Sequence, residues 1–285
     1  MSRRPSPRPT FDAPTSIRAQ DATMHLWGDE ASGWVSDRIF VSTEQVHQLE
    51  LSIPSGGRFQ HSENNRTFFA ADEVFIVLDG VLALANPATG EVQRVEPGEA
   101  VFFRRDTWHH GFSVGERPLR VLEYFCPPPA QGTSSSYAMQ HDNLTAWSYT
   151  HDESLGHWPM EAEEITARQS MRVLRSADRL WRMEGGGPSA LVGLFVSTEH
   201  MTVGTLSLLS GQRSGHRVHP GQTALYVIEG ELHVFTPDDG PPSWFELRAG
   251  DGFFVPEGRP YELYNMSGDW MEAAFVVAPD YVDES

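Results

Sequence analysis

The chain has 285 residues, of which 39% are hydrophobic, and it carries 39 acidic against 21 basic side chains. A formal net charge of −18 repels nucleic-acid phosphates and anionic lipids, so we expect neither nucleic acid nor a membrane surface as a partner. The single cysteine, Cys126, excludes an internal disulfide and fits a cytoplasmic protein, and no apolar run reaches the about 20 residues of a membrane helix.

A strand-rich pattern follows a short N-terminal tail. Residues 1–15 are rich in Pro, Ser and Arg and lack an apolar stretch, which predicts a disordered tail rather than a secretory signal. Beyond them, short apolar or alternating runs are separated by Gly and Pro, a pattern typical of strands. These runs are HQLELSIP, EVFIVLDGVLALAN, EAVFFR and LRVLEYF. Many short strands at regular spacing indicate a β-sandwich or barrel.

A second set of strands follows a linker. The linker, residues 129–169, begins within the Pro- and Ser-rich segment PPPAQGTSSS. Near its end, charged and apolar residues at helical spacing predict a short helix. After it, the runs VGTLSLLS, ALYVIEGELHVFT, GDGFFVP and EAAFVVA again predict strands. We therefore expect one barrel at 16–128 and another at 170–285.

The two sets of strands are copies of one another. The segment FVSTE at 40–44 recurs at 195–199, and SGGRFQH, which ends at His61, recurs as SGQRSGH, which ends at His216, both 155 positions later. Gly80 recurs only 150 positions later, so the first copy carries about five extra residues after His61. Such repetition indicates a duplicated domain, and the need to cover barrel edges predicts that the two barrels pack together.

Two motifs in each copy resemble those of the cupin family. In the first copy, Glu73 precedes Gly80 by seven positions, as in the first cupin motif, and Pro97-Gly-Glu99 followed by His109 is similar to the second. In the second copy, the strand that ends at Gly230 and the Gly-Asp-Gly segment after it resemble the same motifs. The resemblance implies an all-β fold with two tandem cupin-type antiparallel β-barrels, the double-stranded β-helix or jelly roll, in one chain.

The resemblance also implies a metal site in the first copy. At the family's ligand positions stand His61, Glu73 and His109, which implies one divalent metal. The family's second histidine is absent, and Glu63 at its spacing is read either as a fourth ligand or as a solvated loop acid. Two imidazoles and a carboxylate with open positions suit Fe(II), which we favour, while Mn, Ni and Zn remain open.

The second copy departs from this ligand pattern. Thr223 stands at the glutamate position and Tyr261 at the last histidine position, which leaves His216 and His219 as the remaining candidates. We therefore expect no tightly bound transition metal in this copy, and a role for it in packing.

Alternation along the strands predicts a pocket beside the metal. If Glu73 and His61 face inward, Phe75 and Phe59 do so too, and they give the pocket an aromatic wall.

The loop between the first two ligands carries further candidates for the pocket. We interpret Arg66, Phe68 and Phe69 either as part of a lid over the site or as an anchor of the loop to the barrel. Arg104 is a candidate for binding a substrate carboxylate, with an exposed Arg–Asp pair as the alternative. His110 and Glu63 are the candidates for a catalytic base.

These features predict a metal-dependent enzyme that acts on a small organic substrate able to chelate the metal. We favour a non-haem iron dioxygenase. The alternatives are a non-oxidative isomerase, cyclase or lyase using the same site, and a non-catalytic binding or sensor protein using the barrel cavity. Association into a homodimer is compatible with all three.

Overall fold

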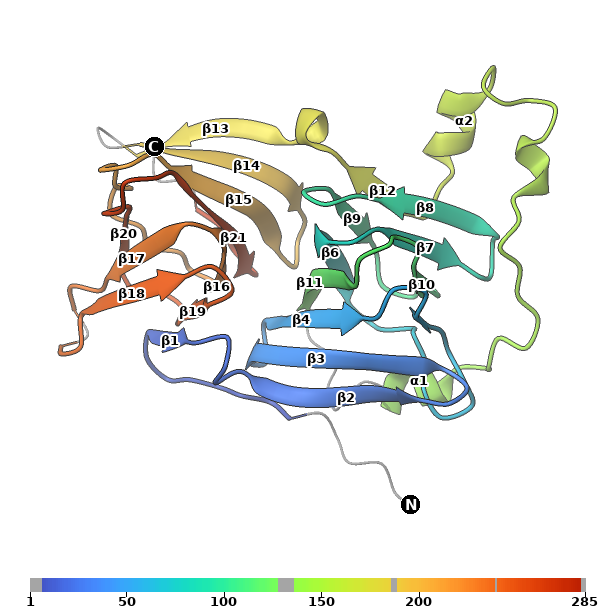
Figure 1. Ribbon diagram of the computed structural model, residues 1–285, viewed down its shortest axis with the longest axis horizontal. Coiled ribbons are helices and arrows are strands. Elements are labelled where there is room, and N and C mark those ends of the chain that lie inside the picture. The colour runs from blue at the N-terminus through green and yellow to red at the C-terminus, as the bar shows by residue number, and fades with distance from the viewer. Residues whose placement is uncertain (1–6, 128–135, 186–188, 239, 283–285) are drawn as a thin grey trace.

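The structure is a computed structural model and describes residues 7–127, 136–185, 189–238 and 240–282. Residues 1–6 of the predicted tail and 129–135 of the predicted linker lie outside the described residues. Two β-barrels stand side by side, and the linker runs along the outer side of the first (Figure 1). In the described part, helix is confined to short segments, which are α1 (Ser136–Gln140), α2 (Ala162–Ala167) and the 3-10 turns η1 (Asp152–Ser154) and η2 (Ser176–Asp178).

The first barrel consists of a large and a small antiparallel sheet, as far as the described residues define them. The large sheet has the order β12-β9-β6-β11-β4-β3-β2, formed by Met171–Leu174, Ala100–Phe103, Asp72–Asp79, Leu119–Cys126, His47–Ile53, Gly33–Ser42 and Thr23–Asp29. The small sheet has the order β5-β10-β7-β8, formed by Arg58–Phe59, His110–Ser113, Leu82–Asn86 and Glu91–Val95.

The second barrel repeats this arrangement. Its large sheet has the order β1-β19-β16-β21-β15-β14-β13, formed by Thr15–Ile17, Gly252–Val255, Gln222–Glu229, Met271–Ala278, Thr202–Leu208, Ala190–Ser197 and Leu180–Glu184. Its small sheet has the order β18-β17-β20, formed by Trp244–Arg248, Glu231–Phe235 and Glu262–Tyr264. The predicted all-β fold of two tandem antiparallel barrels is confirmed.

Each large sheet ends in a strand from the other half of the chain. Strand β1 pairs with β19 of the second barrel, with Ser16 opposite Phe253. Strand β12 pairs with β9 of the first barrel, with Arg172 opposite Phe102. Helix α2 lies near the end of the linker and has only 6 residues. Strand β12 begins four residues after it ends.

The barrels also share an apolar cluster, as expected from the need to cover their large sheets. Val74 and Tyr124 of the first barrel and Val203 and Tyr226 of the second are members of this buried cluster. At its margin the Tyr226 hydroxyl donates to Glu50 Oε2 at 2.7 Å, so a hydrogen bond between the barrels accompanies the apolar contact.

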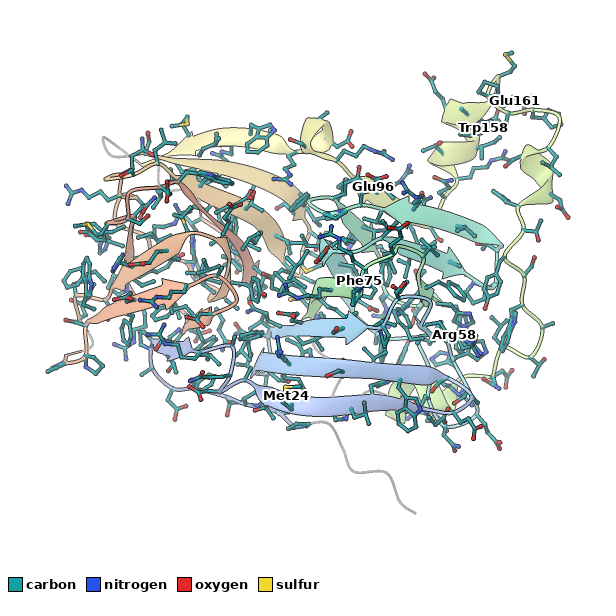
Figure 2. All side chains as sticks on the ribbon, in the orientation of Figure 1. Met24, Arg58, Phe75, Glu96, Trp158 and Glu161 are labelled. Atoms are coloured by element: carbon teal, nitrogen blue, oxygen red, sulfur yellow. The ribbon has the colours of Figure 1, made fainter. Side chains whose placement is uncertain are left out.

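The interior of the first barrel forms a separate core because side chains alternate along its strands. On β11, Val121 and Phe125 point into the barrel while Tyr124 points toward the second barrel. Phe75 lies inside the barrel, and Met24 and Trp158 lie on the outside of the molecule (Figure 2). No helix in the described part is long and apolar enough to span a membrane.

Candidate metal centre and cavity

The first barrel encloses a cavity of about 70 Å³, room for several water molecules or a fragment of a small organic molecule. Apolar and aromatic side chains form most of its wall, and a few ionisable groups interrupt them. Pro7 and Arg8 of the N-terminal segment belong to the lining together with Trp27, Val35, Asp37, Ser42, His47, Leu49, Leu51, Phe59, Thr67, Phe69, Phe75, His109, Glu123 and Phe125.

Strand register brings carboxylates to this interior. Strand β11 places Phe125 between His47 and Glu73 on its two neighbours, and Glu123 two residues earlier lies between Leu49 and Phe75. Residues two apart on a strand share a face, so Glu73 and Glu123 both point inward.

Glu73 and His109 form a buried pair. The Nδ1 atom of His109 donates to the Thr107 carbonyl at 3.1 Å, because a carbonyl can only accept, and Nε2 therefore keeps its lone pair. This Nε2 lies 3.6 Å from Oε2 of Glu73, a buried oxygen that has no hydrogen-bond partner among the described residues. Burial without a partner is costly for such an oxygen, so the pair is poised for a cation or a proton.

Aromatic rings surround this pair. The ring centroids of Phe59, Phe69, Phe75 and Phe103 lie 4.8–6.0 Å from that of His109. A β-carbon on Gly111, opposite Phe59 on β10, would stand 2.2 Å from the Phe59 ring, so glycine makes room for this ring.

Burial determines the protonation of these groups. It raises the pKa of Glu73 well above the usual range, and the neighbouring Glu123 and Asp72 raise it further. It likewise raises the pKa of Glu123, with Asp37 adding to the effect. The pKa of His109 falls to about 4, mainly because burial disfavours the imidazolium. His109 is therefore neutral at pH 7, as a metal ligand must be.

The third predicted ligand, His61, has both ring nitrogens engaged outside the cavity. Its Nε2 donates to the Leu144 carbonyl at 2.7 Å, and its Nδ1 lies 2.6 Å from Nε2 of His110. His110 Nδ1 in turn lies 2.8 Å from the Tyr149 hydroxyl. Burial lowers the pKa of both imidazoles, that of His110 to about 3.

His61 does not join Glu73 and His109 in this structure. Across the described ranges, these three residues do not bring three ligand atoms within 4.8 Å of one another. Strand β5 ends at Phe59, so the alternation that directs Phe59 inward stops before His61. The structure thus brings together two of the three predicted ligands.

The two phenylalanines of the loop from Ser62 to Ala71 point in different directions. Phe69 faces the cavity, with its ring 5.2 Å from that of Phe125. Phe68 faces the linker, with its ring 4.8 Å from Trp108 and stacked on Tyr137. Both are buried.

The charged residues of the loop point elsewhere. Arg66 donates through Nη1 to the carbonyls of Ala138 at 2.7 Å and His141 at 2.6 Å, which fastens the linker to the barrel. Glu63 is exposed on the loop.

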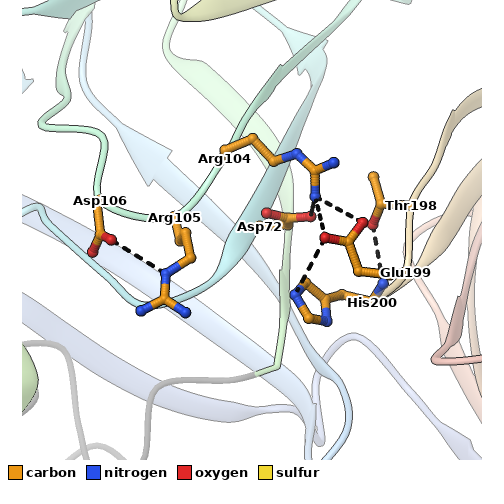
Figure 3. A network of polar contacts seen from close by, with 7 residues as sticks. All are labelled: Asp72, Arg104, Arg105, Asp106, Thr198, Glu199 and His200. Carbon is orange, nitrogen blue, oxygen red and sulfur yellow. Dashed lines mark hydrogen bonds and ion pairs between the residues drawn. The ribbon is translucent and has the colours of Figure 1, made fainter.

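Arg104 lies in a polar network between the barrels rather than in the cavity wall (Figure 3). Its Nη1 lies 2.8 Å from Asp72 Oδ2 and 3.0 Å from the Glu199 carboxylate of the second barrel. A role for Arg104 in substrate binding stays a prediction.

Sequence reasoning overlooked Glu123, Asp37 and His47 in the cavity. Each occupies an inward position of a strand whose neighbours at two-residue spacing are apolar. A polar residue at a strand position whose neighbours two residues away are apolar is the pattern that could have identified them.

In the second barrel, buried side chains bond to one another near Tyr261, which stands at the position of His109. Arg217 Nη2 lies 2.7 Å from Glu184 Oε2, and the Tyr281 hydroxyl donates to Glu184 Oε1 at 2.6 Å. The ring of His219 stacks on that of Tyr281 with centroids 4.8 Å apart.

Comparison with known proteins gives one family match and many structural matches. The family described as Cupin domain matches residues 57–125 and 204–277. No curated protein sequence gave a significant match.

The structural matches are similar in fold at low sequence identity. A variant of oxalate decarboxylase from Bacillus subtilis matches with a TM-score of 0.63 and 14% identity, over 98% of this chain and 81% of that one. A structure concerning the Mn(II) centres of the same enzyme matches with a TM-score of 0.61, 13% identity and coverages of 96% and 80%. AerE from Microcystis aeruginosa matches with a TM-score of 0.59, 8% identity and coverages of 90% and 97%.

Proposed function

Because this chain belongs to the cupin family and carries two copies of its domain, we propose that its first barrel is a metal-dependent enzyme acting on a small organic molecule. The observation that carries the proposal is the buried Glu73–His109 pair, of which His109 lines the cavity, with one unpartnered carboxylate oxygen and one imidazole lone pair 3.6 Å apart.

The pair fits a divalent ion. Ligand atoms bind such ions at about 2.0–2.2 Å, so two ligands of one ion stand roughly 3–4 Å apart, and the observed separation is 3.6 Å. His61 is the proposed third ligand and would have to release Leu144 or His110 to take part. We favour Fe(II), while the Mn(II) centres of the matched oxalate decarboxylase make manganese the main alternative.

The bound ion would polarise a substrate oxygen and lower the pKa of a substrate hydroxyl. The rings of Phe59, Phe69 and Phe75 would hold an apolar substrate body and exclude water. Glu123, whose pKa burial raises, would hold a proton at its carboxyl group and deliver it to the substrate or remove it.

Two reaction classes suit this arrangement. We favour dioxygen chemistry on a chelating substrate, as the two predicted imidazoles and one carboxylate suggest. Glu123 supports the second class, a non-oxidative lyase or isomerase, because proton transfer is the step such reactions require and a protonated buried carboxyl can perform it.

Reconstitution of the full chain with Fe(II), Mn(II), Ni(II) and Zn(II), followed by elemental analysis, tests the proposal. We expect one metal ion in the first barrel, lost in His109→Ala and retained in the control His216→Ala, which changes an exposed imidazole of the second barrel. Equal metal content in the two variants would refute the site. Turnover that persists without oxygen would select the non-oxidative class.

A further inference from the structure

A second group of metal-ligating side chains lies on the outer face of the second barrel. Leu232 and Val234 of β17 and Leu247 of β18 belong to the core of that barrel. The intervening Glu231 and His233 therefore face outward. So does Glu246 of β18, which stands opposite His233 in the strand register.

The three side chains converge. One ligand atom from each of Glu231, His233 and Glu246 lies within 4.8 Å of the other two, and His233 Nε2 is 3.3 Å from Glu231 Oε1. Adjacent antiparallel strands hold all three, so the spacing is set by the sheet and not by a mobile loop.

The imidazole of this group is buried although it lies on the outer face. His233 is only 8% exposed, and its Nδ1 is buried without a hydrogen-bond partner among the described residues. The ring of Trp244 lies 5.7 Å away and covers it from one side. The ring nitrogen that faces the cluster is Nε2, on the side of Glu231, so an ion held by the three residues would bind His233 through this atom.

Arg248 stands opposite Glu231 in the strand register and is the charged neighbour of the cluster. Arg248 is 3.0 Å from Oε1 of Glu246, and its guanidinium is largely exposed, so solvent weakens this ion pair. Tyr264, opposite His233 on β20, directs its hydroxyl to Glu262 and not to the cluster.

We propose that Glu231, His233 and Glu246 hold one divalent transition-metal ion, of the Zn(II) class, separate from the centre in the first barrel. One imidazole and two carboxylates form a mixed nitrogen and oxygen set, which borderline ions accept better than Mg²⁺ does. The ion ties β17 to β18 and has a structural role. This site does not depend on the function proposed for the first barrel, and it involves neither His216 nor His219.

Zinc titration of the full chain by calorimetry in excess Mg²⁺ tests this site. We expect His233→Ala to bind one Zn²⁺ fewer per chain than wild type, whereas the matched control His216→Ala binds the same number as wild type. Identical stoichiometry and affinity in His233→Ala and wild type would overturn the proposal.

A second variant decides the question if His233→Ala does not fold. Glu246 is exposed, so Glu246→Gln should leave the fold intact. Loss of this ligand should weaken the site at least about tenfold, and Zn²⁺ binding as tight as in wild type would again overturn the proposal.

Discussion

At the scale of single residues, the three predicted ligands differ in what their polar atoms already do. His109 keeps the Nε2 lone pair toward Glu73, whereas both nitrogens of His61 have partners outside the cavity. We expect His61→Ala to retain more metal than His109→Ala in parallel reconstitution followed by elemental analysis. His61 has to give up Leu144 or His110 before it binds the ion, so it should be the weaker ligand, and equal loss in the two variants would contradict this order.

Motif spacing identified Glu73 and His109, and the structure does bring these two side chains together. It could not identify the direction of His61, because this residue follows the end of β5, where the two-residue alternation no longer holds. The environment of His61 comes from Leu144 and Trp147 in the linker, far along the chain. Contacts of this kind depend on tertiary structure and leave no local pattern in the sequence.

His47 predicts a pH dependence of stability. Burial lowers its pKa to about 3, below the 6.5 of an unfolded histidine, so the unfolded chain binds more protons between these values. The stabilising effect of neutral His47 is present above pH 6.5 and is lost as the pH falls toward 3. Between pH 7.5 and 5.5, wild type should lose about 1 kcal/mol more unfolding free energy than His47→Gln.

Urea unfolding of both proteins at the two pH values provides the measurement. The other buried histidines, such as His109 and His219, are common to both proteins, and their effects cancel in the difference. If the two proteins lose the same free energy on acidification, His47 is not neutral in the folded state.

At the scale of elements, the loop from Ser62 to Ala71 carries one phenylalanine that packs against the linker and one that lines the cavity, so their substitution should have different effects. Phe68→Ala removes contacts with Trp108 and Tyr137 and should lower the unfolding free energy by about 3 kcal/mol without changing turnover per bound metal. Phe69→Ala opens the cavity wall beside His109 and should lower turnover at normal metal content. Turnover per bound metal that is unchanged in Phe69→Ala would end the interpretation of this loop as a lid.

The strands were the most predictable elements because burial of one face imposes a pattern on the sequence. HQLELSIP, for example, is β4 followed by Pro54. The linker was less predictable because its order comes from contacts with the barrel. Arg66 holds the carbonyls of Ala138 and His141, an interaction between residues more than 70 positions apart. At the end of α2, Arg172 of β12 likewise donates to the carbonyls of Thr166 and Ala167.

At the scale of the whole molecule, the two barrels should unfold together. Their large sheets share a buried apolar cluster, the Tyr226–Glu50 hydrogen bond lies at its margin, and Arg104 bridges Asp72 to Glu199. Separation of the barrels would expose this cluster to water, so neither barrel is stable while the other is unfolded. We expect a single calorimetric transition for the full chain, and two resolved transitions would contradict the shared core.

The pairing of β1 with β19 and of β12 with β9 makes the two halves of this chain obligate complements. A protein cut within the linker after Asp142 would leave each fragment holding the strand that completes its counterpart, while β9 or β19 stays an unprotected edge that invites aggregation. The fragments should therefore be insoluble when expressed singly and should reassemble when coexpressed. After the two halves had exchanged these strands, neither half could fold as an independent protein. Deletion of either half from the gene would therefore leave the remaining half without a strand of its own sheet.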